Sequence, residues 1–175
     1  MFLEIVVKTA IVHTLTYFVV GVTAFTVFNY AATLAHPANN MKPPDDPLVR
    51  AATLFQPIRG IIFGVILYLL RGVVFFGGWS GWLIVWIMFV GIGIIGTFAP
   101  TRSSIEGFIF LKSSEGTNWG GLVEILLQSL LLSFVTWYWV VHPEDVWLSW
   151  MLGILFVLAI IASTFGLLET LKKRL

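Results

Sequence analysis

The residues best suited to chemistry in this chain are a few polar side chains that interrupt long apolar stretches. Charges in or near hydrocarbon are costly when unpaired, so they mark candidate sites. We expect six polar residues to lie at one level of a membrane, where one interpretation is a pocket for a lipid headgroup, a substrate or an ion: Gln56, Arg59, Arg102, Glu106, Glu124 and Gln128. Arg59 would pair with Glu124, and Arg102 would hold Glu106 or an anionic headgroup. Alternatively, these charges pair or snorkel and only fix the depth of their helices.

A second polar group recurs along the first apolar stretch at helical spacing. This stripe consists of Thr9, His13, Thr16, Tyr17, Thr23 and Tyr30. Lipid tails offer these polar side chains no hydrogen-bond partners, so the stripe should face other helices or a water-filled path. Two interpretations of His13 stay open: a proton-relay or ligand histidine, or a buried histidine bonded to a neighbouring hydroxyl.

The same residue types could act as cofactor ligands. His13 and His142 are expected in the outer half on different helices, which would suit a haem held by two histidines, but His142 precedes Pro143 and fits a surface loop better. The pair Asp45 and Asp46 would suit a divalent cation, but Asp46 is better explained as a helix N-cap. Cysteine is absent, and no zinc-protease, nucleophile-elbow or Walker motif occurs. The sequence therefore predicts no cofactor and no metal site.

The composition indicates the solvent in which these polar residues must be positioned. Of the 175 residues, 58% are hydrophobic and 11% are charged, and the mean hydropathy is +0.95. Soluble domains carry about 25% charged residues, so this chain is not expected to fold as a soluble enzyme. The net charge of +1 offers no basic stripe for nucleic acid. We predict an integral membrane protein.

The apolar stretches predict the architecture. About 20 apolar residues are needed to cross about 30 Å of hydrocarbon, and Thr9 to Met41 contains no Asp, Glu, Lys or Arg. We predict an all-α, polytopic fold with residues 1–175 in a single membrane domain. Its five transmembrane helices are expected at residues 4–33, 57–76, 82–98, 122–141 and 146–168.

The connections carry local signals. Asp46 before Pro47 predicts an N-cap with proline at the first helical position, opening a short cytoplasmic interfacial helix over Pro47–Phe55. Pro57 is expected to break or kink the chain after it. The mixed segment Thr101–Gly121 is too short to cross and would lie in the interface or re-enter it.

Small residues four apart offer places where helices approach closely. They occur as Gly60 with Gly64, Ala159 with Ser163, and Ala162 with Gly166. These faces would serve either the internal bundle or a partner subunit. At the N-terminus, Glu4 and Lys8 are four residues apart and are expected to pair.

The distribution of cations predicts the orientation. One side would carry Lys8 and Arg71, whereas the other would carry the remaining eight: Lys42, Arg50, Arg59, Arg102, Lys112, Lys172, Lys173 and Arg174. The positive-inside rule then places the N-terminus outside and the C-terminus in the cytoplasm, in the plasma (inner) membrane. Four tryptophans would anchor the outer interface: Trp79, Trp82, Trp147 and Trp150.

Three classes of function fit these features. The first, which we favour, is a non-enzymatic accessory or interaction subunit, or a small binder, that works with a partner. The second is a small oligomeric transporter or channel with a polar path. The third is a lipid-modifying enzyme at the cytoplasmic leaflet, with Glu106 or Glu124 as general base and arginines holding phosphate. The expected partners are membrane lipids and either another membrane subunit or further copies of this chain, not nucleic acid.

Overall fold

The computed structural model describes residues 1–28, 42–96, 104–110 and 119–173. Within these residues every regular element is helical. The α-helices and the π-helix η2 are α1 (Phe2–Val27), α3 (Pro47–Arg50), α4 (Ala52–Leu69), α5 (Arg71–Val74), α6 (Gly81–Val90), η2 (Gly91–Ile95), α7 (Ile105–Phe110), α8 (Trp119–Val141) and α9 (Val146–Lys172).

Four of these helices are long and apolar enough to cross a membrane: α1, α4, α8 and α9. Their outward faces carry exposed Ile, Leu, Val and Phe side chains, as lipid-facing helices do. The all-helical fold and the membrane location are thus supported. The predicted fifth span, 82–98, is described as a helix only over Gly81–Ile95. That length is about 22 Å at ~1.5 Å per residue, short of the about 30 Å of hydrocarbon, so the count of five stays a prediction.

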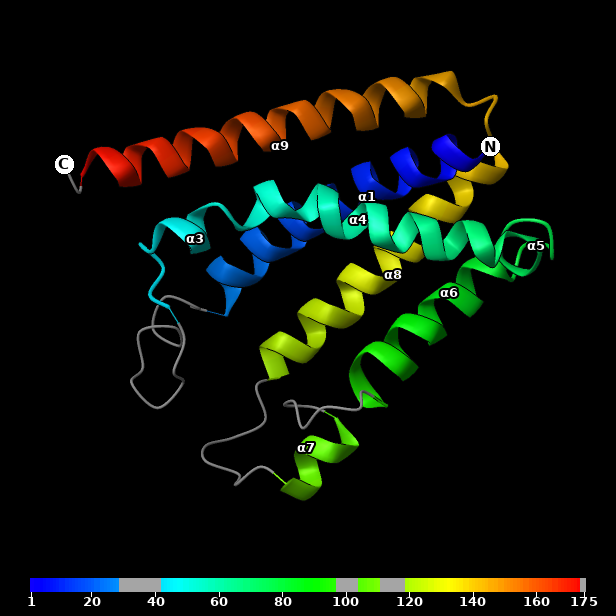
Figure 1. Ribbon diagram of the computed structural model, residues 1–175, viewed down its shortest axis with the longest axis horizontal. Helices are drawn as coiled ribbons and strands as arrows, with labels where there is room; N and C mark the ends of the chain where they lie inside the picture. Colours follow the sequence, from blue (N-terminus) through cyan, green and yellow to red (C-terminus); the bar gives the residue numbers. More distant parts are fainter. Residues whose placement is uncertain (29–41, 97–103, 111–118, 174–175) are drawn as a thin grey trace.

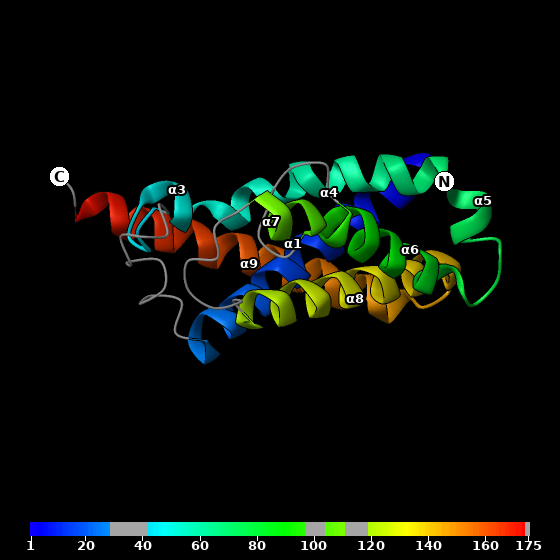
Figure 2. The ribbon, with the colours of Figure 1, turned by 90° about the horizontal axis from the view of Figure 1, so that it is seen from below.

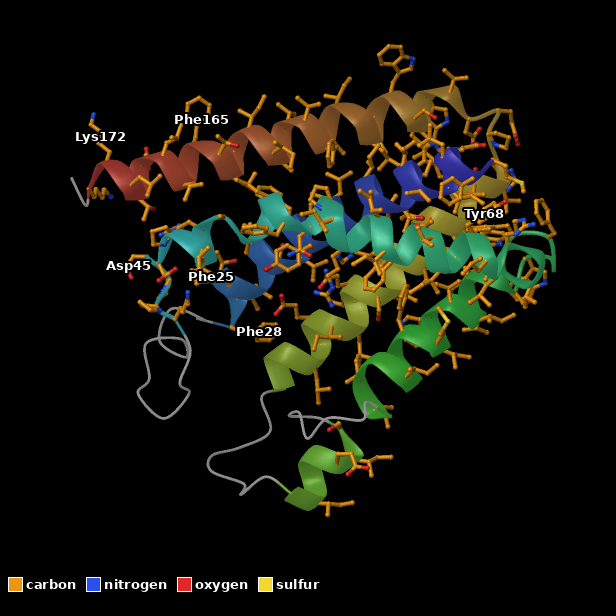
Figure 3. The ribbon with its side chains drawn as sticks, in the orientation of Figure 1. Phe25, Phe28, Asp45, Tyr68, Phe165 and Lys172 are labelled. Carbon is orange, nitrogen blue, oxygen red and sulfur yellow. The ribbon has the colours of Figure 1, made fainter. Side chains whose placement is uncertain are left out.

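The long helices run back and forth between two ends of the molecule (Figures 1 and 2). The N-terminal end holds Met1, α5 and the α8–α9 connection, and the α3 end holds α3, the start of α8 and the end of α9. Figure 3 shows Tyr68 at the N-terminal end, and Phe25, Asp45 and Lys172 at the α3 end. α8 and α9 diverge from their short connection toward the α3 end (Figure 1).

Helix α1 is the centre of the bundle. It packs against α4, α8 and α9, while α6 packs on α8. More of α1 is buried than of any other candidate span in the described chain. The closest packing is with α4, because Gly60 and Gly64 lie directly against the backbone of α1. This pair of glycines therefore serves the internal bundle.

The start of α4 corrects one prediction. Asp46 caps α3 as expected, since its Oδ1 accepts a hydrogen bond of 2.8 Å from the backbone N–H of Leu48, and Pro47 is the first helical residue. However, the expected helix Pro47–Phe55 is divided at Ala51, and Pro57 lies inside α4 rather than breaking the chain. Pro57 is in the second turn, so only one early hydrogen bond is lost, and the packing of α4 on α1 holds the helix together.

Other boundaries move by a few residues. α4 ends at Leu69, and α5 follows it, where one span over 57–76 was expected. α8 begins at Trp119 and α9 continues to Lys172. In the segment 101–121, α7 is a helix, while residues 101–103 and 111–118 lie outside the described part. Residues 29–33 of the first predicted span also lie outside it.

The N-terminal end is fixed by polar contacts. Lys8 is buried, and its Nζ donates to Glu4 Oε1 at 2.9 Å and to the carbonyl of Trp139 at 2.8 Å. The predicted Glu4–Lys8 pair is confirmed, and the same ammonium also joins α1 to the last turn of α8. A lysine at a helix C-terminus is favoured by the helix dipole.

Candidate functional site

The six residues of the predicted polar pocket take different places. Gln56 is buried, Arg59 is exposed, and Glu106, Glu124 and Gln128 are half-buried. Arg102 lies outside the described residues. Arg59 and Glu124 both lie within electrostatic range of the Tyr17 phenol. Their direct pairing stays a prediction.

The most buried polar contact among these residues joins α1 to α4. His13 Nε2 lies 3.1 Å from Gln56 Oε1, and Gln56 Nε2 donates to the carbonyl of Ala52 at 3.0 Å. Because the amide oxygen can only accept, His13 must donate from Nε2, which leaves Nδ1 as an acceptor. Among the residues that the structure describes, this buried Nδ1 has no hydrogen-bond partner. Phe63 packs edge-on against the imidazole, with ring centroids 5.0 Å apart.

Most of the other described residues of the polar stripe on α1 form hydrogen bonds with backbone carbonyls of the same helix. Thr9 and Thr16 are buried, and their hydroxyls donate to the carbonyls of Ile5 and His13 at 2.7 and 3.1 Å. Thr23 departs from the expected inward orientation, since it is exposed and bonds to Val19. Tyr30 lies outside the described residues. Most of the stripe's hydroxyls are therefore not free to line a polar path.

A large cavity lies at the α3 end. It has a volume of about 910 Å³ and is bounded by α1, residues 42–44, α3, α4, α8 and α9. Most of its lining is apolar, including Phe18, Val22 and Phe25 of α1. The polar part of the lining consists of Tyr17, Thr26, Lys42, Arg50, Thr53, Glu124 and Ser163. We call this the polar-mouthed cavity.

Each helix contributes to this cavity for a local reason. Tyr17 and Gly21 are one turn apart on α1, and Glu124 Oε1 lies 3.8 Å from where a Cβ on Gly21 would stand, which is an ordinary contact distance. Thr53 is on the first turn of α4. Ser163 and Gly166 are on the inward side of α9, where Gly166 has nothing within 4 Å of a Cβ position.

A second cavity of about 390 Å³ lies between α1, α8 and α9. Thr16 is its one polar lining residue, and that hydroxyl is bonded to the backbone of α1. The rest of the lining is aliphatic or aromatic, with Leu15, Leu131 and Leu155 as examples. Phe18 and Ala162 line both cavities, so the two adjoin. We call this the apolar cavity.

Sequence reasoning found Tyr17 and Glu124 but missed most of the polar-mouthed cavity. From the sequence, Lys42 and Arg50 contribute only to the predicted orientation in the membrane. Thr53 and Ser163 are not predicted as polar residues of a site. One signal was present: Lys42 and Arg50 are eight residues apart, on either side of Pro43, Pro44 and Pro47. Their convergence depends on the path of the chain.

Metal and haem ligation find no support in the part of the chain that the structure describes. No group of three or more His, Asp or Glu residues is placed to hold a metal there. His142 bonds to Glu144 (3.0 Å) and His13 to Gln56. Glu144 is outside the spans, and a backbone hydrogen bond together with His142 lowers the pKa of its carboxyl.

Comparison of the chain with family models, with curated proteins and with solved structures finds no match. The geometry of the two cavities is therefore the basis on which a function can be inferred.

Proposed function

We propose that this protein is a non-enzymatic membrane protein that binds a small amphipathic molecule in the polar-mouthed cavity and works with a partner subunit. The observation that carries the proposal is a cavity of about 910 Å³ with apolar helix faces inside and Lys42 and Arg50 in its lining. Ligand pockets are typically concave, mostly apolar and of about 300–1,000 Å³, with a few polar groups that orient the ligand.

The charge distribution supports a cytoplasmic location for this cavity. Lys42, Arg50, Lys172 and Lys173 are at the α3 end, whereas Lys8 and Arg71 are at the other. By the positive-inside rule, the α3 end would face the cytoplasm and the N-terminus would lie outside the plasma membrane. Exposed Trp79, Trp147 and Trp150 would then anchor the outer interface.

The test uses two glycines of α9 at which an added side chain would meet open space. Gly166 lines the polar-mouthed cavity, and Gly153 lines neither cavity. Gly166→Phe should fill the cavity, while Gly153→Phe changes the same helix in the same way outside it. The purified full chain would be incubated with a total membrane lipid extract, and bound molecules counted by native mass spectrometry.

We expect wild type and Gly153→Phe to retain a bound amphiphile and Gly166→Phe to lose it. Equal retention by all three proteins would show that the cavity is not the binding site. Unfolding temperatures of the two variants would establish that both are folded.

One observation favours a second candidate function, an oligomeric transporter. His13 and Gln56 form a buried polar pair inside candidate spans, Nδ1 of His13 has no hydrogen-bond partner among the described residues, and Arg59 lies near enough to act on the imidazole electrostatically. Polar groups within a span often belong to ion or proton pathways. Proton flux in liposomes that is lost in both Gln56→Leu and Glu124→Gln would support this function over simple binding.

A further inference from the structure

The polar-mouthed and apolar cavities together have the form of a site for one kind of molecule. They meet at Phe18 and Ala162. The lining of the polar-mouthed cavity includes charged and hydroxyl-bearing side chains, whereas the lining of the apolar cavity is aliphatic or aromatic apart from Thr16. We infer that the bound molecule is a phosphate-bearing lipid, with its phosphate at Lys42 and Arg50 and one acyl chain in the apolar cavity. This inference rests on the proposed function and names the class of its ligand.

The apolar cavity suits a hydrocarbon chain better than water. A cavity lined by Leu, Val and Phe offers water no hydrogen-bond partners and stays dry unless an apolar group enters. Its lining extends along α1 from Val12 to Val19, which corresponds to about 10 Å at ~1.5 Å per residue. Residues of α8 and α9 line the same stretch, and several of them, such as Leu131, Leu155 and Leu158, are exposed. The cavity is therefore an open groove in which a chain entering at Phe18 would lie against side chains from three helices.

The headgroup side is defined by charge. Lys42 and Arg50 both line the cavity; Lys42 precedes α3 and Arg50 is the last residue of that helix. An Arg guanidinium binds phosphate oxygens in a bidentate manner, and a Lys ammonium adds a point charge. Tyr17, Thr53 and Ser163 bring hydroxyls to the same lining, and these can donate to the ester and glycerol oxygens of a headgroup.

The charged residues of the cavity lining are two cations, Lys42 and Arg50, and one carboxylate, Glu124. The carboxylate lies against Gly21 of α1, whereas one cation precedes α3 and the other is the last residue of that helix. Asp46 is engaged as the N-cap of α3. Asp45, beside it, is exposed and is not part of the cavity lining. Two cations against one lining carboxylate favour an anionic headgroup.

The experiment separates headgroup from tail. Binding of phosphatidylglycerol and of diacylglycerol, which lacks the phosphate, would be measured on the purified full chain by native mass spectrometry. The headgroup variant is Lys42→Gln with Arg50→Gln, and its control is Lys172→Gln with Lys173→Gln, which removes the same charge at the same end. The tail variant is Leu158→Trp in the apolar cavity, and its control is Leu168→Trp, on the same helix and similarly exposed.

Loss of a charge-assisted hydrogen bond should weaken phosphatidylglycerol about tenfold for each cation removed. We expect the headgroup variant to lose phosphatidylglycerol but not diacylglycerol, the tail variant to lose both, and both controls to match wild type. Diacylglycerol binding as tightly as phosphatidylglycerol to wild type would overturn the phosphate assignment while leaving amphiphile binding intact.

Two further outcomes have distinct meanings. Displacement of phosphatidylglycerol by glycerol phosphate at equal concentration would show that the acyl chains contribute nothing to the affinity. That result would overturn the placement of an acyl chain in the apolar cavity. If no lipid binds the wild-type chain at all, the proposed binding function fails together with this inference.

Discussion

Gly64 in α4 lies so close to α1 that a Cβ atom on it would stand 2.6 Å from the Cα of Val6. One turn earlier, Gly60 stands in the same relation to Ala10, at 2.5 Å. Only a residue without a side chain permits this approach. Gln56 is a further turn back on the same buried face, so the glycine contact also sets the distance between Gln56 and His13.

Replacing either glycine should therefore separate the two helices. We expect Gly60→Ala and Gly64→Ala each to destabilise the fold by about 1–3 kcal/mol, as overpacked core positions do. Gly72→Ala provides the control, because nothing lies within 4 Å of a Cβ there. Thermal unfolding in detergent would measure the effect, and equal melting of all three variants would contradict the close packing.

The His13–Gln56 hydrogen bond should couple α1 and α4 energetically. His13→Leu or Gln56→Leu alone leaves a buried partner unsatisfied, at a cost of about 1–3 kcal/mol. The double variant should cost less than the sum, with a coupling of about 0.6–1.7 kcal/mol as found for hydrogen bonds between membrane helices. Strictly additive unfolding free energies would show that the pair does not interact.

Lys8 should contribute more to the stability of the fold than an exposed lysine near the end of the chain. Lys8→Met removes the bonds to Glu4 and to the carbonyl of Trp139, and leaves that carbonyl without this donor, at an expected cost of about 1–3 kcal/mol. Lys172→Met, at an exposed position, should have little effect. Urea titration in mild detergent would compare the two, and similar losses would contradict the role of Lys8 as a link between α1 and α8.

The α8–α9 connection should weaken in acid. A backbone hydrogen bond and His142 hold the pKa of Glu144 below its ordinary value of 4.5. The carboxylate of Glu144 binds its proton less tightly in the folded protein than in the unfolded one. Its contribution to the free energy of unfolding is therefore full above pH 4.5 and is lost as the pH falls through the pKa of the folded state. The unfolding temperature of Glu144→Gln should thus depend less on pH than that of wild type.

The size of this pH effect should be small, because the carboxylate is exposed. His142→Phe removes one of the two causes and should give an intermediate profile. Identical profiles for wild type and Glu144→Gln, measured from neutral to acidic pH, would exclude a role for this carboxylate.

Features that depend on neighbours within a few residues could be predicted from the sequence. The all-helical membrane character follows from composition, because apolar stretches of this kind cannot be hidden from water in a soluble fold of this size. The Asp46 cap and the Glu4–Lys8 pair follow from spacings of two and four residues, which helix geometry alone brings together.

The tertiary structure decided what depends on contacts between distant segments. The helix boundary falls at Ala51 rather than at Pro57, since the glycines of α4 pack on α1 and hold the proline within a helix. Composition could not tell that α1 would become the central helix, or that Lys42 and Arg50 would join Glu124 around one cavity. Lys42 and Arg50 are far from Glu124 in sequence, and only the packing of α1 against α4, α8 and α9 brings these residues around the same cavity.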